Sequence, residues 1–199
     1  MQNSEAYLEF IDDLKKEGFQ KKDGYNPKLL KEIYDWERSD VEDKIWVKFH
    51  ENDGSLVDFL PQLKKYDGIT ALKNCKYLKN IPSFASVNTA RVLYECTLDS
   101  KYLFIIKDNI NTAKDSMEYV SILVRCTPSA TWKELLKEIY INSNDNINRN
   151  IVIWGLLYSI GRLKEIGNSV EIRENRELIN KFRVDDKEQR IQLVKQYFE

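Results

Sequence analysis

Hydrophobic residues recur at helical spacing along most of this chain, and one stretch repeats the same pattern twice. The segment RVLYECT at 91–97 returns as SILVRCT at 121–127, thirty residues later. The match continues beyond the following turn, where residues 102–108 align with residues 132–138. Each copy predicts a helix, a short break and a second helix. An internal period of this size is typical of stacked helical repeats, because one helix pair cannot bury its apolar face without its neighbours.

Capping residues predict where the N-terminal helices begin. Ser4 predicts the N-cap of a first helix over residues 4–17. Asn26-Pro27 predicts the start of a second helix, because proline is favoured at the first helical position. Ser39 predicts the N-cap of a third helix, with Glu42 completing a capping box.

The rest of the chain continues in the same way. Asp67 predicts the cap of a helix over 67–79, and further helices are predicted at 83–97, 99–109, 112–127, 130–142, 147–163, 171–182 and 185–198. The predicted fold class is all-α: a right-handed α-solenoid of antiparallel helix pairs with about ten or eleven helices. The chain 1–199 is predicted to form one domain, with acidic helices at 1–60, the clearest repeats at 83–163 and a capping helix at 185–199.

The first helix of each repeat carries the spacing L-x-x-C/S, with Leu93 and Cys96, Leu123 and Cys126, and Leu156 and Ser159. Together with aliphatic pairs on the second helices, this spacing resembles HEAT or armadillo-like repeats over about residues 40–199. The period is shorter than the usual HEAT repeat of about 40 residues, which leaves TPR-like hairpins as a second interpretation. The resemblance implies a curved surface, lined by the second helix of each pair, that holds a protein or a nucleic acid.

Small bacterial HEAT-like proteins include two groups that are relevant to function. One group resembles immunity or accessory proteins encoded beside a secreted toxin, and the other comprises HEAT-like DNA glycosylases. The resemblance therefore implies either an inhibitory protein–protein complex or a nucleic-acid enzyme. A structural adaptor is a third alternative.

Composition favours helices and gives no sign of export. The chain has seven Gly and four Pro in 199 residues, and few helix breakers favour helix. The N-terminus lacks a signal-peptide pattern, and no apolar run approaches the roughly 18 residues of a membrane span. We therefore expect a cytoplasmic protein without membrane association. Cys75, Cys96 and Cys126 are predicted to be small buried hydrophobic residues in a reducing compartment.

Charges nearly cancel overall but are unevenly distributed. The formal net charge is −1, whereas residues 1–60 hold 15 acidic and 9 basic side chains. Residues 61–107 hold 3 acidic and 8 basic side chains. An acidic surface steers association with a basic partner, and many nuclease toxins are basic because they approach phosphate. Glu32, Asp35 and Glu37 are therefore the predicted partner-binding acids, while Asp40 and Glu42 are assigned to helix starts.

A second candidate surface lies on the second helices of the two clearest repeats. Trp132 takes the position of Tyr102 near the start of the second helix and is predicted to be half exposed. Large amphipathic side chains in such positions are good interface anchors. Tyr102 and Trp132, with their neighbours Lys133 and Glu134, are therefore predicted to contact a partner.

No catalytic, cofactor or metal site is predicted. His50 is the only histidine, so a histidine-dependent nucleophile has a single available base. The chain contains no CxxC, no HExxH and no Gly-rich phosphate loop. An enzyme is therefore not expected.

Nucleic acid is the alternative partner. The basic segment that favours it consists of Lys64, Lys65, Lys73, Lys76 and Lys79. Tyr66 and Tyr77 lie nearby and can stack on bases, but the surrounding protein is not basic, which favours a solvated helix face. A glycosylase also needs a carboxylate beside aromatic rings, for which Asp99 with Tyr102 or Trp132 is the candidate. We therefore predict a non-catalytic protein-binding repeat protein of the immunity type, with DNA binding or base repair as the alternative.

Overall fold

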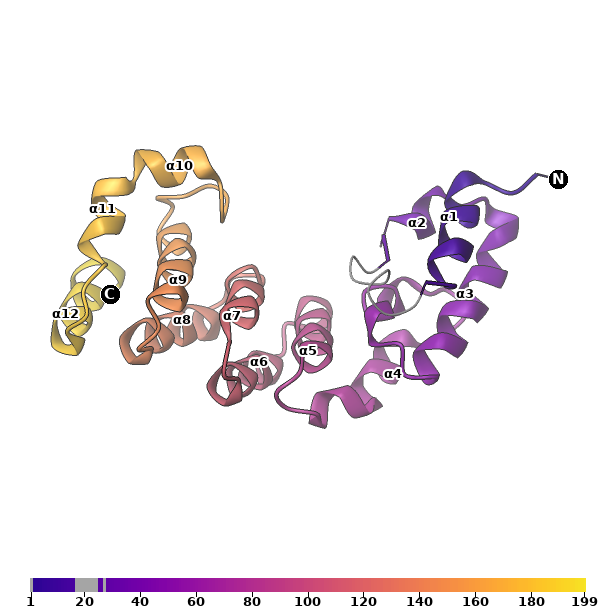
Figure 1. Ribbon diagram of the computed structural model, residues 1–199, viewed down its shortest axis with the longest axis horizontal. Helices are drawn as coiled ribbons and strands as arrows, with labels where there is room; N and C mark the ends of the chain where they lie inside the picture. The colour runs from indigo at the N-terminus through magenta and orange to yellow at the C-terminus, as the bar shows by residue number, and fades with distance from the viewer. Residues whose placement is uncertain (1, 17–24, 27) are drawn as a thin grey trace. The chain divides into compact units, whose positions relative to one another are not determined.

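The computed structural model describes residues 2–16, 25–26 and 28–199. These residues form twelve α-helices and three 3-10 helices, without a strand among them (Figure 1). The predicted all-α class is confirmed, with slightly more helices than expected. No helix in this described part of the chain is long and apolar enough to cross a membrane. The first helix ends at Asp13, earlier than the predicted residue 17, and the predicted helix start at Pro27 lies outside the described residues.

The chain divides into two compact units, residues 1–80 and 81–199, which we call unit 1 and unit 2. Unit 1 contains α1 (Glu5–Asp13), α2 (Leu29–Glu32), α3 (Asp35–His50), η2 (Gly54–Leu56), η3 (Leu60–Gln62), α4 (Gly68–Asn74) and η4 (Lys76–Lys79). Unit 2 contains α5 (Phe84–Thr97), α6 (Lys101–Thr112), α7 (Met117–Val124), α8 (Ala130–Asn142), α9 (Asn146–Ser159), α10 (Ser169–Glu174), α11 (Arg176–Lys181) and α12 (Lys187–Phe198). Each unit has its own buried core and is described by itself.

The core of unit 1 contains a cluster of aromatic rings. The ring centroid of Phe10 lies 5.9 Å from that of Tyr25 and 6.2 Å from that of Phe59. At the start of α4, Gly68 packs directly against the backbone of Leu60. A Cβ atom at Gly68 would lie 1.9 Å from the carbonyl oxygen of Leu60, so this close approach requires glycine.

Helix α3 begins earlier than predicted and runs through the expected N-cap. Its first residue is Asp35, so Ser39 lies inside the helix and is exposed. Glu42 is buried, and its carboxylate accepts the backbone N–H groups of Lys64 at 3.0 Å and Lys65 at 2.8 Å. The predicted capping box of Ser39 and Glu42 is therefore wrong, because Glu42 bonds to a segment distant in sequence instead.

Arg38 completes this connection. Its Nε atom donates to Glu42 Oε1 at 2.5 Å. The same guanidinium donates to the carbonyl oxygens of Leu30 at 2.5 Å and Gln62 at 2.6 Å. Burial alone would raise the pKa of Glu42, but the hydrogen bonds from Arg38 and from two backbone N–H groups hold it below its usual value. One Arg–Glu pair therefore joins α2, α3 and the segment before α4.

The predicted helix over 67–79 is divided at Cys75. Asp67 caps α4 as predicted, because its carboxylate accepts the N–H group of Thr70 at 3.0 Å. The backbone of Cys75 is extended, with ψ at 154°, and the 3-10 helix η4 follows it. The apolar pattern of this segment therefore spans two short elements.

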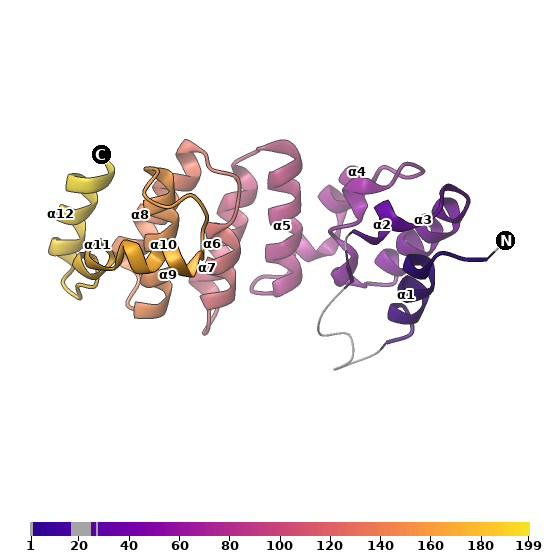
Figure 2. The same cartoon turned by 90° about the horizontal axis from the view of Figure 1, so that it is seen from above.

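The helices of unit 2 pack in alternation along the chain. Helix α5 packs against α6 and α7, and α7 packs against α9. Helix α6 packs against α7 and α8, and α8 packs against α9 and α12. Figure 2 shows α5 to α9 side by side. Successive helices of unit 2 therefore bury their apolar faces against near neighbours in the sequence.

The repeated leucines form the core of unit 2. Leu93, Leu123 and Leu156 are fully buried, which confirms that they are core positions. Helix α9 approaches α7 and α8 closely at Gly155. A Cβ atom there would lie 2.7 Å from a methyl group of Leu136, so glycine permits this packing.

The three cysteines are free and lie in different surroundings. Cys126 is buried, as predicted, and Cys75 is half-buried. Cys96 is exposed, so the prediction that it is buried is wrong. The two repeat positions differ because Cys96 lies in the last turn of α5, whereas Cys126 follows the end of α7 at Val124.

Candidate protein-binding surface

The turn between α2 and α3 is fixed by a buried carboxylate. Glu37 is 1% exposed and accepts the backbone N–H group of Tyr34 at 2.9 Å. Its oxygens also accept the backbone N–H group and the hydroxyl of Ser4, at 2.7 and 2.6 Å. Ser4 in turn caps α1 by accepting the N–H group of Tyr7 at 3.1 Å. One carboxylate therefore closes the start of α3 and joins it to the start of α1.

The negative charge of Glu37 is stabilised by hydrogen bonds within unit 1. Burial alone would raise the pKa of Glu37, but the hydrogen bonds from Ser4 and Tyr34 lower it below its usual value. A second contact between the same helices supports the arrangement, because the hydroxyl of Tyr7 donates to Asp40 at 2.8 Å. Asp40 also pairs with Lys44. The start of α3 is thus held rigidly against α1.

Two aromatic rings extend from this fixed turn into solvent. Tyr34 is 52% exposed and Trp36 is 50% exposed. Their ring centroids lie 6.2 Å apart, with the planes tilted by 32°. Tyr and Trp are enriched among residues that dominate protein–protein binding energy, because they bury a large area with few rotatable bonds. The pair is therefore a suitable anchor for a partner.

Carboxylates surround the two rings. Glu5, Glu32 and Asp35 are exposed, and none of them makes a hydrogen bond or ion pair with a residue that the structure describes. Lys31 is also exposed and offsets part of this charge. Because the carboxylates are free, they can attract a basic partner.

A hollow of 480 Å³ adjoins Tyr34. Residues 2–6, Glu32 and Tyr34 line it, so Glu5 and Glu32 both face this space. The hollow provides a concave neighbour to the two exposed rings. We call the set Glu5, Glu32, Tyr34, Asp35 and Trp36 the aromatic–acidic surface.

No protein-family model, curated protein or solved structure matches this chain. The HEAT or armadillo-like resemblance therefore rests on the internal repeat described above and remains a prediction.

The structure brings together two of the three acids predicted to bind a partner. Glu32 and Asp35 are exposed and belong to the aromatic–acidic surface. The expectation that Glu37 is available to a partner is wrong, because its carboxylate is buried and bonded to Ser4 and Tyr34. Its contribution to the surface is indirect, since it fixes the backbone that carries the rings.

The repeat aromatics are not exposed. Tyr102 is 3% exposed and Trp132 is 0% exposed, so the prediction of a half-exposed Trp132 is wrong. The indole N–H group of Trp132 donates to the carbonyl oxygen of Leu123 at 2.8 Å. Its ring also lies 3.5 Å from the Cβ position of Gly155, where the missing side chain leaves room for it. Both aromatics are therefore core residues of unit 2.

Their polar neighbours lie at the surface of unit 2. Lys133 is half-buried, while Glu134 is exposed and pairs with Lys137 at 2.8 Å. Glu134 lines a hollow of 420 Å³ together with Phe104, which is 46% exposed. The predicted set Tyr102, Trp132, Lys133 and Glu134 is thus not a continuous exposed surface.

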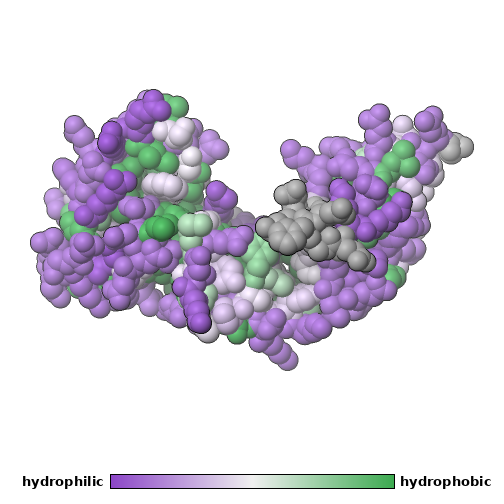
Figure 3. Space-filling model, in the orientation of Figure 1, coloured by the Kyte–Doolittle hydropathy of each residue, from purple (hydrophilic) through white to green (hydrophobic). Residues whose placement is uncertain are grey.

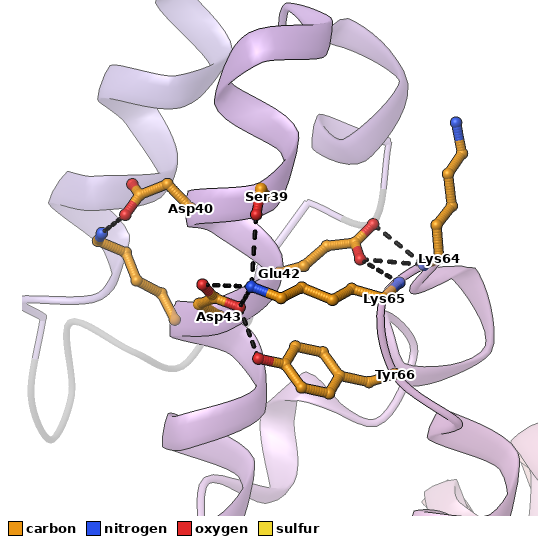
Figure 4. A network of polar contacts seen from close by, with 8 residues as sticks. Ser39, Asp40, Glu42, Asp43, Lys64, Lys65 and Tyr66 are labelled. Atoms are coloured by element: carbon orange, nitrogen blue, oxygen red, sulfur yellow. Dashed lines mark hydrogen bonds and ion pairs between the residues drawn. The ribbon is translucent and has the colours of Figure 1, made fainter.

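The basic segment of unit 1 is partly neutralised. Nζ of Lys65 pairs with Asp43 at 2.6 Å, and the hydroxyl of Tyr66 donates to the same carboxylate at 2.6 Å (Figure 4). The side chain of Lys64 points away from α3 in the same view (Figure 4). The lysines that make no ion pair with any described residue are Lys64, Lys73, Lys76 and Lys79. Four free cations therefore remain around residues 64–79.

Sequence reasoning missed Tyr34 and Trp36. One signal in the sequence indicates that a helix starts here: the acidic first turn formed by Asp35 and Glu37, which is typical of a helix N-terminus. Tyr34 is not a usual N-cap residue, and its side chain makes no capping hydrogen bond. The start of α3, and with it the exposure of both rings, was therefore not evident from the sequence.

Proposed function

We propose that this chain is a non-catalytic protein-binding protein whose aromatic–acidic surface binds a partner with a basic surface. The observation that supports it is the pair of half-exposed rings, Tyr34 and Trp36, on a turn locked by Glu37. Exposed aromatic anchors surrounded by unpaired charge combine binding energy with electrostatic steering. An immunity-type inhibitor that covers a basic toxin domain in the cytoplasm is the form of this function that we propose.

The surface suits an interface of mixed polarity. Hydrophilic residues cover most of the face shown in Figure 3, with hydrophobic residues in small groups. Interfaces formed by proteins that also exist separately have about the same polarity as the rest of the surface. A separately folded partner therefore fits better than an obligate subunit.

We also propose that unit 2 is a HEAT-like right-handed α-solenoid. The alternating packing of α5 to α9 and the equivalent burial of Leu93 and Leu123 support this proposal. In this arrangement the surface hollow of unit 2 near Phe104 and Glu134 is available for further contacts.

DNA binding or base repair is less well supported. Lys65 is paired with Asp43 and is not available to a phosphate of duplex DNA. The exposed carboxylates of unit 1 would also repel a phosphate backbone. A structural adaptor would use the same aromatic–acidic surface without inhibiting its partner.

The experiment is a charge reversal on this surface. The partner is purified from extracts of the source cells with the tagged full-length chain, and its association rate is measured by stopped flow. Replacing Glu32 and Asp35 with lysine should slow association about tenfold at low salt, because steering is lost. The difference should shrink at high salt, where exposed charges are screened.

A matched control reverses two acids of unit 2. Glu174 and Glu177 are exposed and make no ion pair with a described residue, so Glu174→Lys with Glu177→Lys changes the net charge equally. We expect this variant to associate at nearly the original rate. Equal slowing in both variants would show that only total charge matters and would contradict the proposed site.

A further inference from the structure

Unit 1 contains a second concave site at the other end of α3. A cavity of 680 Å³ lies between the C-terminal turn of α3 and the elements α4 and η4. Ligand sites for small molecules commonly enclose about 300–1,000 Å³. The site lies about 20 Å along α3 from Trp36, since each helical residue rises about 1.5 Å. It is therefore distinct from the aromatic–acidic surface.

A column of rings forms one wall of this cavity. The rings of Trp46 and Tyr66 are nearly parallel, with 4.4 Å between centroids and 7° between planes. The His50 ring lies 4.5 Å from Trp46, and its Nδ1 atom bonds to the carbonyl oxygen of Trp46 at 2.8 Å. The hydroxyl of Tyr66 is held by Asp43 at 2.6 Å. The column is therefore fixed before any ligand binds. Lys65 Nζ lies over the Tyr66 ring, 5.6 Å from its centroid, and the exposed His50 ring continues the column as aromatic surface for a planar ring.

The cavity lining also supplies a free cation. Lys76 lines the cavity and makes no ion pair with any residue that the structure describes. Lys65 also lines it but pairs with Asp43. The carboxylate of Asp67 accepts the N–H group of Thr70, and Lys73 is a further exposed cation in the adjoining helix. Asp67 also lines the cavity and partly offsets this charge, so Lys76 is the lining group that can hold a negatively charged part of a ligand.

Among the lining residues, Tyr77 carries a buried hydroxyl group without a hydrogen-bond partner in the described part of the chain. Its side chain is 8% exposed. Buried hydroxyl groups are usually hydrogen-bonded, so an unpaired one on a cavity wall is unusual. The exposed amides of Asn52 and Asn74 line the same space and are free to bond a ligand.

We propose that this cavity binds a nucleotide, with its base against the ring column of Trp46 and Tyr66 and its phosphate near Lys76. Base–aromatic stacking and a nearby cation are the two interactions that bind nucleotides without sequence readout. The nucleotide is either a free nucleoside monophosphate or one residue of a single strand. Both sources share the same base and phosphate chemistry.

Calorimetric titration of the full-length chain with AMP, GMP, CMP and UMP tests the proposal. At least one of these should bind, and adenosine or inorganic phosphate alone should bind about tenfold more weakly or worse. Equal affinity for the nucleoside and the nucleotide would overturn the role of Lys76. A short single-stranded oligonucleotide that binds about tenfold more tightly than the best mononucleotide assigns the site to a strand, and equal binding assigns it to the free nucleotide.

Matched variants locate the site. Trp46→Ala should weaken binding about tenfold, whereas Trp36→Ala, on the aromatic–acidic surface, should leave it unchanged. Lys76→Glu should weaken binding about tenfold, whereas Lys181→Glu, at an exposed residue of unit 2, should not. Unchanged affinity in Lys76→Glu would contradict the proposal.

Alkylation of cysteines in the unaltered chain tests the proposal without depending on whether the variants fold. Cys75 lines the cavity and is half-buried, while Cys96 is exposed in unit 2. A bound nucleotide should slow alkylation of Cys75 several-fold and leave the rate at Cys96 unchanged. If no mononucleotide or oligonucleotide gives a binding heat or protects Cys75, the cavity is not a nucleotide site.

Discussion

Unit 1 and unit 2 are both helical, but different interactions hold their helices together. In unit 1 the buried carboxylates of Glu37 and Glu42 bond to backbone groups that are distant in sequence. In unit 2 the repeated leucines, Leu93 and Leu123, fill the space between successive helices. Both units therefore bury an apolar core, but unit 1 adds buried carboxylates that accept charge-assisted hydrogen bonds from backbone groups distant in sequence.

The difference explains where exposed binding groups occur. Glu37 fixes the turn through hydrogen bonds to Ser4 and Tyr34, and the rings of Tyr34 and Trp36 remain half exposed. In unit 2 the aromatics Tyr102 and Trp132 fill the core between helices. The paired exposed rings therefore lie at the hydrogen-bonded turn of unit 1, whereas the aromatic residues at the repeat positions of unit 2 belong to its core.

The largest effect is expected in the core of unit 2. Leu93→Ala and Leu123→Ala should each lower the free energy of unfolding by about 2–5 kcal/mol, because each leaves a cavity at a fully buried site. The two losses should be similar in size, since the residues occupy equivalent positions. Urea denaturation measures both. A loss at one site more than twice that at the other would contradict the equivalence of the repeats.

A smaller effect is expected from the buried carboxylate of unit 1. Glu42→Gln should lower the free energy of unfolding by about 1.5–3 kcal/mol, because charge-assisted hydrogen bonds to Arg38 and to the backbone are lost. Hydrogen exchange should quicken in residues 63–65 and α3, with little change in unit 2. Thermal melting and exchange mass spectrometry measure the two effects.

Asp40 offers the control on the same helix. It pairs with Lys44 and accepts an exposed hydrogen bond from Tyr7, so Asp40→Asn should cost about 0–1 kcal/mol. If Asp40→Asn and Glu42→Gln destabilise equally, burial of the Arg38–Glu42 pair is not what holds unit 1 together.

The predicted and observed helix bounds agree for α8 of unit 2 but differ for α3 of unit 1. Helix α8 was predicted at 130–142 and is found at Ala130–Asn142, because its signals are local: Ser129 caps it at 3.1 Å and its apolar face is periodic. In unit 1 the start of α3 depends on Glu37 bonding to Ser4, 33 residues away. Such a contact leaves no pattern in the neighbouring sequence, so both the helix start and the site at Tyr34 and Trp36 were missed.

Charge in the sequence predicts exposed residues better than aromatic side-chain size does. The acidic excess of residues 1–60 led to Glu32 and Asp35, which are exposed. It could not separate them from Glu37, because exposure depends on tertiary hydrogen bonds. Aromatic size led to Tyr102 and Trp132, which the close approach at Gly155 and the packing of α8 place in the core.

The smallest expected effect is the pH dependence of the Glu42 contribution. The pKa of Glu42 is lowered in the folded chain, while an unfolded Glu has a pKa of about 4.3. Its stabilisation is therefore fully present above about pH 4.3 and is lost as pH falls through the folded pKa. The stability difference between the original chain and Glu42→Gln should be constant from neutral pH to about pH 5 and should shrink below about pH 4. Urea titrations across this range measure it, and a difference that grows on acidification would contradict the sign of the shift.

The most direct test of the central claim is photo-crosslinking at the aromatic–acidic surface. A photoreactive phenylalanine analogue replaces Trp36 in one full-length variant and Phe84, which is 49% exposed in unit 2, in another. In the source cells the Trp36 variant should crosslink to one dominant protein with a basic surface, and the Phe84 variant should not. No crosslink at position 36, or the same products at both positions, would contradict the account.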